Sequence, residues 1–342
     1  MVLYGYIYTS SDSGVTWIER SSYGSRGWLS ITSSADGSKL AAVVEWGYIY
    51  TSSDSGATWI ERSSYGSREW RSITSSADGT KLAALVSYGY IYTSSDSGAT
   101  WIERSSAGSR NWQSITSSGD GSKLAAVVEW GYIFTSSDSG ATWVERSSAG
   151  YQYWYSITIS SDGTKLAAVV NWGGYIYISS DSGATWVPRS SSGYRSWQSI
   201  TSSADGSKLA AFVNGGYIYT SSDSGATWIE RSSYGYLNWQ SITSSSDGLK
   251  LAAVVNGGSL YSIYPFVHPL CSLLAYTNIN SKNLNGWTCD SINQPESDHC
   301  SWQGIQCSDV SVNKNIISID LSNLMISGKN NLLCIPYIFD KN

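Results

Sequence analysis

The residue types that most often carry out chemistry are gathered at one end of this 342-residue chain. The cysteines and histidines all lie in the last quarter, at Cys271, Cys289, Cys300, Cys307 and Cys334, and at His268 and His299. The preceding part therefore holds no histidine for a catalytic triad and no Cys/His set for a metal. Aspartates do recur there, but one carboxylate per turn is a thin ligand set for calcium. We expect no cofactor, no metal and no catalytic residue in that part.

A second group, of aromatic and arginine side chains, has the chemistry of recognition rather than catalysis. Its members stand where otherwise near-identical segments differ from one another, so a shared fold does not dictate them. We predict a ligand-binding face formed by Trp46, Tyr88, Trp130, Trp172, Tyr151, Tyr194, Tyr236, Arg26, Arg68, Arg110 and Arg195. Neutral drift among duplicated segments is the alternative explanation for these differences.

An internal repeat positions these residues. The segment Ser-Ser-Asp-Ser-Gly-x-Thr-Trp recurs every 42 or 43 residues, with its aspartates at Asp12, Asp54, Asp96, Asp138, Asp181 and Asp223. A second segment, Asp-Gly-x-Lys-Leu-Ala-Ala, recurs in step from Asp36 to Asp247. Between these turn signals lie short runs rich in β-branched and aromatic residues, such as 70–75, 81–86, 90–94 and 100–104. One repeat therefore predicts one four-stranded antiparallel sheet.

A unit of this size cannot bury both faces of its sheet alone, and radial packing of such sheets leaves only short, protected edges. The sequence therefore predicts an all-β fold, a six-bladed β-propeller over residues 1–264. A seven-bladed ring or a fragment of a longer array is the alternative, and an open solenoid is the structural rival. In such blades the fourth-to-first and second-to-third connections share one rim, so the variable residues are expected on that rim.

Closure of the ring is expected to join the two ends of the repeat region. Residues 4–20 read as third and fourth strands, and residues 239–255 read as the first and second strands of the same blade. Residues 257–264 copy the third strand again and would compete with residues 4–8 for one place. A blade left unclosed offers a route to self-association.

The invariant side chains of the repeat are expected to be structural. The tryptophans that open the first strands, from Trp28 to Trp239, and those of the aspartate turns, from Trp17 to Trp228, are expected in the core. The repeated fourth-strand arginines, from Arg20 to Arg231, are expected to pair with carboxylates.

The turn at residues 10–17 resembles the Asp-box, or BNR repeat, of sialidases and related propellers, and the resemblance covers about residues 4–264. It implies that the box aspartates bind nearby backbone amides and are structural. Sialidase chemistry needs three clustered arginines, a Tyr–Glu pair and an aspartate, which is an arrangement that breaks symmetry. Here the blades are near-copies, and the Arg-Ile-Pro segment typical of that family is absent. A sialidase-like hydrolase is therefore the least favoured function.

The sequence favours a non-catalytic binding scaffold whose ligand is a glycan or a protein. Near-identical blades suit a ring of weak equivalent sites, as in propeller lectins. A protein-docking propeller similar to photosystem II assembly factors is the alternative. The net charge of −5 gives no footprint for nucleic acid. No apolar run reaches the roughly 18–20 residues that a membrane span needs.

The tail differs in composition. The segment 300–307, Cys-Ser-Trp-Gln-Gly-Ile-Gln-Cys, and residues 317–328 resemble a plant-type leucine-rich-repeat N-terminal cap with one repeat, over residues 265–328, and residues 329–342 do not continue it. The resemblance implies a disulfide between Cys300 and Cys307, and a second between Cys271 and Cys289 is expected. A reduced, disordered tail is the alternative. Disulfides imply an extracellular or secreted protein, although no signal peptide is visible at the N-terminus.

Overall fold

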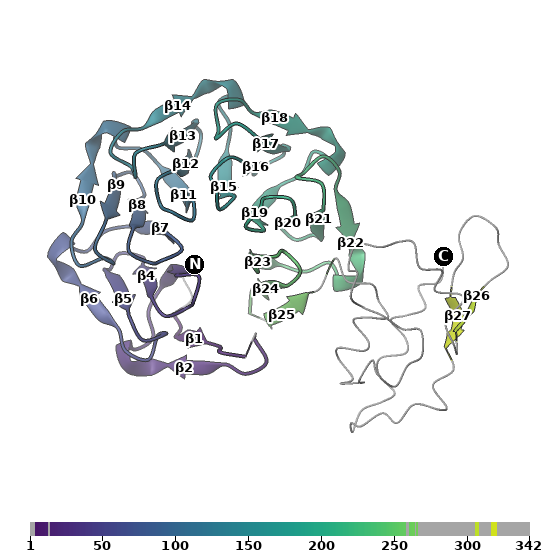
Figure 1. The fold of residues 1–342 in the computed structure, drawn as a ribbon, viewed down its shortest axis with the longest axis horizontal. Helices are drawn as coiled ribbons and strands as arrows, with labels where there is room; N and C mark the ends of the chain where they lie inside the picture. The colour runs from purple at the N-terminus through teal and green to yellow at the C-terminus, as the bar shows by residue number, and fades with distance from the viewer. Residues whose placement is uncertain are drawn as a thin grey trace. The chain divides into compact units, whose positions relative to one another are not determined.

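The computed structural model describes residues 4–12, 14–257, 260–263 and 265, together with the backbone of 305–307 and 316–319. The chain divides into two compact units, residues 1–263 and residues 264–342. The first unit is an all-β propeller whose short antiparallel sheets are arranged around a ring (Figure 1). Among the described residues no helix is long and apolar enough to cross a membrane.

Six blades follow one another, as the repeat predicts, and five of them have four strands. The first strands are β3 (Trp28–Ser33), β7 (Trp70–Ser75), β11 (Trp112–Ser117), β15 (Trp154–Ile159), β19 (Trp197–Ser202) and β23 (Trp239–Ser244). The second strands are β4 (Leu40–Val44), β8 (Leu82–Val86), β12 (Leu124–Val128), β16 (Leu166–Val170), β20 (Leu209–Val213) and β24 (Leu251–Val255). The third strands are β5 (Ile49–Ser52), β9 (Ile91–Ser94), β13 (Ile133–Ser136), β17 (Ile176–Ser179), β21 (Ile218–Ser221) and β25 (Leu260–Ile263).

The fourth strands are short and lie at the outside of the ring. They are β6 (Ile60–Arg62), β10 (Ile102–Arg104), β14 (Val144–Arg146), β18 (Val187–Arg189) and β22 (Ile229–Arg231). A two-stranded sheet, β1 (Ile7–Thr9) with β2 (Ile18–Arg20), precedes the first blade. One 3₁₀ turn follows each of β2, β6, β10, β14, β18 and β22, at Ser21–Tyr23, Ser63–Tyr65, Ser105–Ala107, Ser147–Ala149, Ser190–Ser192 and Ser232–Tyr234.

Adjacent blades bury apolar faces against each other. Ala41, Val43 and Ile49 of the first blade form one cluster with Trp70 and Ile73 of the second, and the next interfaces repeat this pattern. The first-strand tryptophans of blades two to six are fully buried, as the sequence predicts, whereas Trp28 is only half-buried. The core is therefore a series of flat apolar layers between sheets rather than one central cluster.

The fourth-strand arginines differ from their prediction. Their Nε atoms donate to a threonine of the neighbouring third strand, at 2.7–2.9 Å, in the pairs Arg20–Thr9, Arg62–Thr51, Arg104–Thr93, Arg146–Thr135 and Arg231–Thr220. Arg189 breaks the pattern, because Ile178 replaces the threonine and the Arg189 Nε has no partner. The threonine lies diagonally across the strand pair, two positions from the residue opposite the arginine, so its hydroxyl is within reach of the guanidinium.

The predicted closure of the ring is wrong. Strand β25 pairs with β24 and takes the third place of the sixth blade, while β1 pairs with β2. The reason is local, since β25 follows β24 through a short connection and forms its ladder without closing a loop the length of the ring. Strands β1 and β2 instead form a separate sheet between the sixth blade and the first (Figure 1).

In the second unit, β26 (Ile305–Cys307) pairs antiparallel with β27 (Ile316–Ile319). The predicted Cys300–Cys307 and Cys271–Cys289 disulfides and the leucine-rich-repeat cap fall largely outside the described residues and stay predictions.

Candidate functional site

The two variable loops of the repeat lie side by side on one rim of the ring, which we call the variable rim. The second-to-third loop of each of the first five blades forms a β-bridge with the loop that enters the next blade, as Gly47 does with Arg68 and Gly89 does with Arg110. Within one blade, a backbone hydrogen bond of 2.9 Å joins the Glu129 amide to the Asn111 carbonyl, and every other blade repeats it. The scaffold therefore presents the variable residues as one continuous surface.

All seven aromatic residues predicted for the binding face are exposed on this rim, with exposed fractions between 51% and 76%. Four of them, Trp46, Tyr88, Trp130 and Trp172, have backbone φ angles of 49–59°, in the left-handed region. A bulky residue in that region is a genuine outlier. In the fifth and sixth repeats glycine takes the corresponding place, at Gly215 and Gly257.

The four predicted arginines have structural partners as well as exposure. The guanidinium groups of Arg26, Arg68, Arg110 and Arg195 lie 4.6–5.3 Å from the ring centroids of Tyr50, Tyr92, Phe134 and Tyr219. Each Nε also donates to a backbone carbonyl three residues earlier, at 2.7–3.3 Å. Arg110 and Arg195 keep 39% and 42% of their side chains exposed beside Glu145 and Glu230. They cover the aromatic layers and still present charge to solvent.

The rim is not uniform, because aromatic rings gather over the third and fourth blades. Trp130, Tyr153 and Trp172 form a triangle with ring centroids 5.0, 5.8 and 6.5 Å apart, and Tyr155 lies 6.4 Å from Tyr153. We call these four residues the aromatic cluster. Burial, and then the hydrogen bond to Glu129, raise the pKa of Tyr153 to about 12, so its hydroxyl stays protonated at neutral pH.

A chain of side-chain hydrogen bonds adjoins the aromatic cluster through Glu129. Ser87 Oγ donates to Asn111 Oδ1 at 3.0 Å, and Asn111 Nδ2 donates to Glu129 Oε2 at 2.7 Å. Gln113 Nε2 also donates to Glu129, and Gln113 Oε1 accepts from Arg71 Nε at 3.1 Å. These side chains come from the second and third blades. The hydrogen bonds therefore tie the inner edges of these two neighbouring blades together.

Sequence reasoning missed the residues that make the rim asymmetric: Arg71, Asn111, Gln113, Glu129, Tyr153 and Tyr155. A signal was available, because they occupy the positions on either side of the invariant first-strand tryptophan and the first position of the second-to-third loop. Those positions vary among the repeats, although some residues recur, as Gln113 does at Gln198 and Gln240. Their proximity depends on the ring, since they belong to different repeats.

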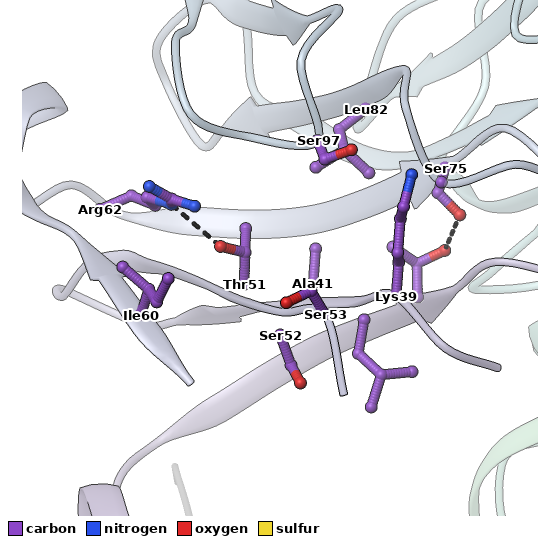
Figure 2. Close-up of a pocket in the computed structure, with 13 residues that line it drawn as sticks. Lys39, Ala41, Thr51, Ser52, Ser53, Ile60, Arg62, Ser75, Leu82 and Ser97 are labelled. Atoms are coloured by element: carbon purple, nitrogen blue, oxygen red, sulfur yellow. Dashed lines mark hydrogen bonds between the residues drawn. The ribbon is translucent and has the colours of Figure 1, made fainter. Parts of the chain in front are cut away.

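Crevices between blades at the other rim are a competing site. One of about 140 Å³ is lined by Lys39, Thr51, Arg62 and Ser75 (Figure 2), and others of about 180 and 130 Å³ are lined by matching residues of other repeats. Their side chains already pair within the crevice, as Arg62 does with Thr51 and Thr32 with Ser75. A feature that recurs with the repeat belongs to the scaffold, so we place the candidate site on the variable rim.

The aspartate turns also lie at that other rim and act as structural clips. In the second repeat, Asp54 Oδ1 accepts from the Thr58 amide at 2.8 Å, and Thr58 Oγ1 donates to Asp54 Oδ2 at 2.6 Å. Trp59 Nε1 donates to the Gly56 carbonyl at 3.1 Å, which holds the tryptophan under the turn. The same contacts recur from Asp12 to Asp223. Among the described residues no group of three His, Cys, Asp or Glu side chains is placed to hold a metal.

The ring of antiparallel sheets and its loop-built rim define a β-propeller with a candidate binding face. No family model and no curated protein matches the chain. Among solved structures it is similar to one described as YCF48 bound to D1 peptide, with a TM-score of 0.59 and 18% identity over 74% of this chain and 84% of that chain. It is also similar to YCF48 from Cyanidioschyzon merolae, with a TM-score of 0.52 and 17% identity over 69% and 81% of the two chains.

A third similar structure is the GH74 enzyme of Niastella koreensis, with a TM-score of 0.57 and 17% identity over 77% of this chain and 43% of that chain. At these identities the likeness shows the fold. Because one of these structures is a peptide complex and another is an enzyme, the fold by itself does not decide between binding and catalysis.

Proposed function

We propose that the chain is a non-catalytic, protein-docking propeller that binds an extended segment of a partner protein on the variable rim, centred on the aromatic cluster. Rigid aromatic rings are the side chains that most often anchor a protein partner. Extended segments with apolar side chains dock on aromatic-lined surfaces of this kind. The similar YCF48 structure, which is described as bound to a D1 peptide, supports this class of ligand.

The left-handed aromatic residues carry the proposal. A left-handed conformation costs an L-residue roughly 1–2 kcal/mol, and the scaffold accepts glycine there in two repeats. Trp46, Tyr88, Trp130 and Trp172 are nevertheless 51–76% exposed, so burial returns little of that cost. Strain held at exposed aromatic side chains points to a ligand rather than to folding.

The differences between repeats favour one composite site over a lectin-like ring of equal sites. Three rings meet at Trp130, Tyr153 and Trp172, whereas the ring contacts at Tyr175–Tyr194 and Tyr217–Tyr236 are single pairs. The fifth and sixth repeats present Gly215 and Gly257 at the position of Trp130. Equal weak sites need equal loops, and these loops are unequal. A single protein segment crossing two or three blades uses such a surface fully.

Selection from random peptides displayed on phage tests the proposal. The affinity of each selected peptide is measured for the wild type and for the variants Trp130→Gly and Trp172→Gly. Glycine is chosen because it fits the left-handed backbone and should leave the fold intact. Loss of an aromatic anchor is expected to weaken binding at least about tenfold. Ile102→Ala, which alters a residue 55% exposed on β10, is the control and should bind as the wild type does.

A glycan array probed with the same variants separates the two ligand classes. Glycan binding that both glycine variants abolish, with no peptide selected, would assign the rim to sugars and reject protein docking. Peptides that bind all variants equally would show that the rim is not the site.

A further inference from the structure

The ring contains a seventh angular place that is only half occupied. A Cβ added at Gly56 of the first blade would lie 2.9 Å from Thr9 Cγ2 of β1, as one added at Gly98 of the second blade would lie 2.7 Å from Thr51 Cγ2. Likewise, a Cβ added at Gly14 would lie 3.6 Å from Ser262 Oγ of β25. Strands β1 and β2 therefore occupy the place of third and fourth strands in a seventh blade. They contact the first and sixth blades as the outer two strands of a complete blade contact the blades on either side.

Within the part of the chain that the structure describes, the inner half of that place is open on both walls. Trp28 is half-buried and Ile31 is 52% exposed, whereas the matching Trp70 and Ile73 are 0% and 4% exposed. On the opposite wall Leu260 is 36% exposed, whereas the matching Ile49 is fully buried. We call the space between these walls the seam.

Side chains at the outer side of the seam are also more exposed than their counterparts in complete blades. Tyr8 of β1 is 48% exposed and Trp17 is 44% exposed, whereas Tyr50 and Trp59 at the matching positions are 0% and 4% exposed. Among the described residues, no strand pairs with the inner edge of β1. An unpaired strand edge between two apolar walls is a template for β-augmentation.

The five complete blades define what fits the seam. In each, the third strand pairs with a second strand in one register, as Thr135 pairs with Ala125 and Phe134 with Ala126. Thr9 and Tyr8 stand at the positions of Thr135 and Phe134, so the edge of β1 specifies Ala-Ala of a second strand opposite them. The open wall at Trp28 and Ile31 lacks the small Ala and Val side chains that Ala41 and Val43 supply to the second blade.

We infer that the seam binds a β-hairpin of a different protein, not a second copy of this chain, and that this hairpin carries the first and second strands of the same repeat. Such a hairpin would pair its second strand with β1 and insert its first-strand tryptophan toward the sixth blade. This binding is separate from peptide docking on the variable rim, because its walls are formed by β3, β24 and β25 rather than by the rim loops.

The probe is the 17-residue peptide with the sequence of residues 112–128, added to the full chain. Hydroxyl-radical footprinting should show Trp17, Ile31 and Leu260 protected, with Trp46 on the variable rim unchanged. Ile31→Lys places a charge against the incoming apolar strand and should weaken binding at least about tenfold. The matched control is Ile102→Lys, which adds the same charge at a residue 55% exposed outside the seam and should bind normally.

A second experiment, with the hairpin fused to the chain, applies if the free peptide does not fold by itself. Residues 112–129 are joined directly before Tyr4, which continues the repeat in register, and a control fusion lacks one residue at the junction. The in-register fusion should raise the unfolding midpoint and protect the same three residues, whereas the shifted fusion turns its apolar face the wrong way and should not.

The inference is supported if the peptide binds in the seam or if the in-register fusion protects it. It is overturned if neither result is found. Sedimentation velocity tests the other occupant: a dimer that Ile31→Lys dissociates would place a second copy of the chain in the seam and would also overturn it. Trp130→Gly should leave hairpin binding intact, so the two proposals can fail independently.

Discussion

A side chain in this repeat can be judged against five counterparts in the same molecule. At the second-to-third loop the counterparts differ in kind, with aromatic residues in four repeats and glycine in two, while the backbone keeps one left-handed geometry. The scaffold dictates the backbone, and the aromatic side chain is an addition to it. Stability and recognition therefore place different demands on this position.

Tyr88→Gly separates those demands. Tyr88 has a φ of 52° and is 73% exposed, so its removal relieves a left-handed L-residue and sacrifices little buried area. Because glycine itself loses about 0.5–1 kcal/mol of backbone entropy on folding, the unfolding free energy should stay level or rise by up to about 1 kcal/mol. Urea denaturation followed by circular dichroism measures the change.

The reverse substitution, Gly215→Trp, is the control for Tyr88→Gly. It places an L-residue at a φ of 53° but removes the backbone entropy that glycine loses on folding, so the unfolding free energy should stay level or fall by up to about 1 kcal/mol. If both variants have the same unfolding free energy as the wild type, the left-handed backbone carries no cost at these positions.

Tryptophans of the repeat differ in energetic weight according to their place in the ring. Trp112 is fully buried between blades, so Trp112→Ala should cost about 3–5 kcal/mol. Trp17 is 44% exposed at the seam, and Trp17→Ala should cost about 1 kcal/mol, mainly its hydrogen bond to the Gly14 carbonyl. Urea midpoints of the two variants test this, and similar losses would mean that the seam is covered in solution.

At the scale of the element, the aspartate turns link stability to pH. Hydrogen bonds from the side chain and amide of Thr58, and then from Ser52, lower the pKa of Asp54 from its ordinary 3.8 to about 2. The pKa values of Asp138 and Asp181 are lowered to about 2 in the same way. A folded-state pKa below the unfolded value gives stability that is present above about pH 4 and is lost as the pH falls toward 2.

Asp54→Asn tests this linkage. The amide keeps the shape of the carboxylate but loses its charge-assisted hydrogen bonds, so the variant should be less stable than the wild type at pH 7. The difference in thermal midpoint should narrow between pH 4 and pH 2, where the wild-type carboxylate becomes protonated. A gap that stays constant across this range would contradict the lowered pKa.

At the scale of the whole molecule, the ring is unequal around its circumference. Blades two to five have partners on both faces, whereas β1, β2 and β25 border the seam. Local stability follows buried contacts and paired backbone groups.

Hydrogen exchange should therefore be fastest in β1 and β25 and slowest in the inner strands of the third and fourth blades, such as β12 and β16. Mass spectrometry of native-state exchange at neutral pH measures this order. Uniform protection around the ring would show that the seam is closed in solution, and the in-register fusion should remove the difference.

The amino-acid sequence alone determined the repeat, the strand order within a blade and the core role of most of the repeated tryptophans, with Trp17 and Trp28 at the seam as exceptions. These follow from turn residues and apolar patterns within one repeat, such as Asp54 to Trp59, whose contacts are local. It also placed the exposed aromatic residues on one rim, because the connections of an antiparallel sheet alternate between its two ends.

Only the tertiary structure decided which strand occupies the last blade and which rim residues meet. Residues 257–264 and 4–8 are near-copies, so their sequences cannot rank them, and the short connection from β24 favoured β25. The contacts of Trp130 with Trp172 and of Arg71 with Gln113 join different repeats. Such contacts depend on how the sheets are packed around the ring, which no single repeat encodes.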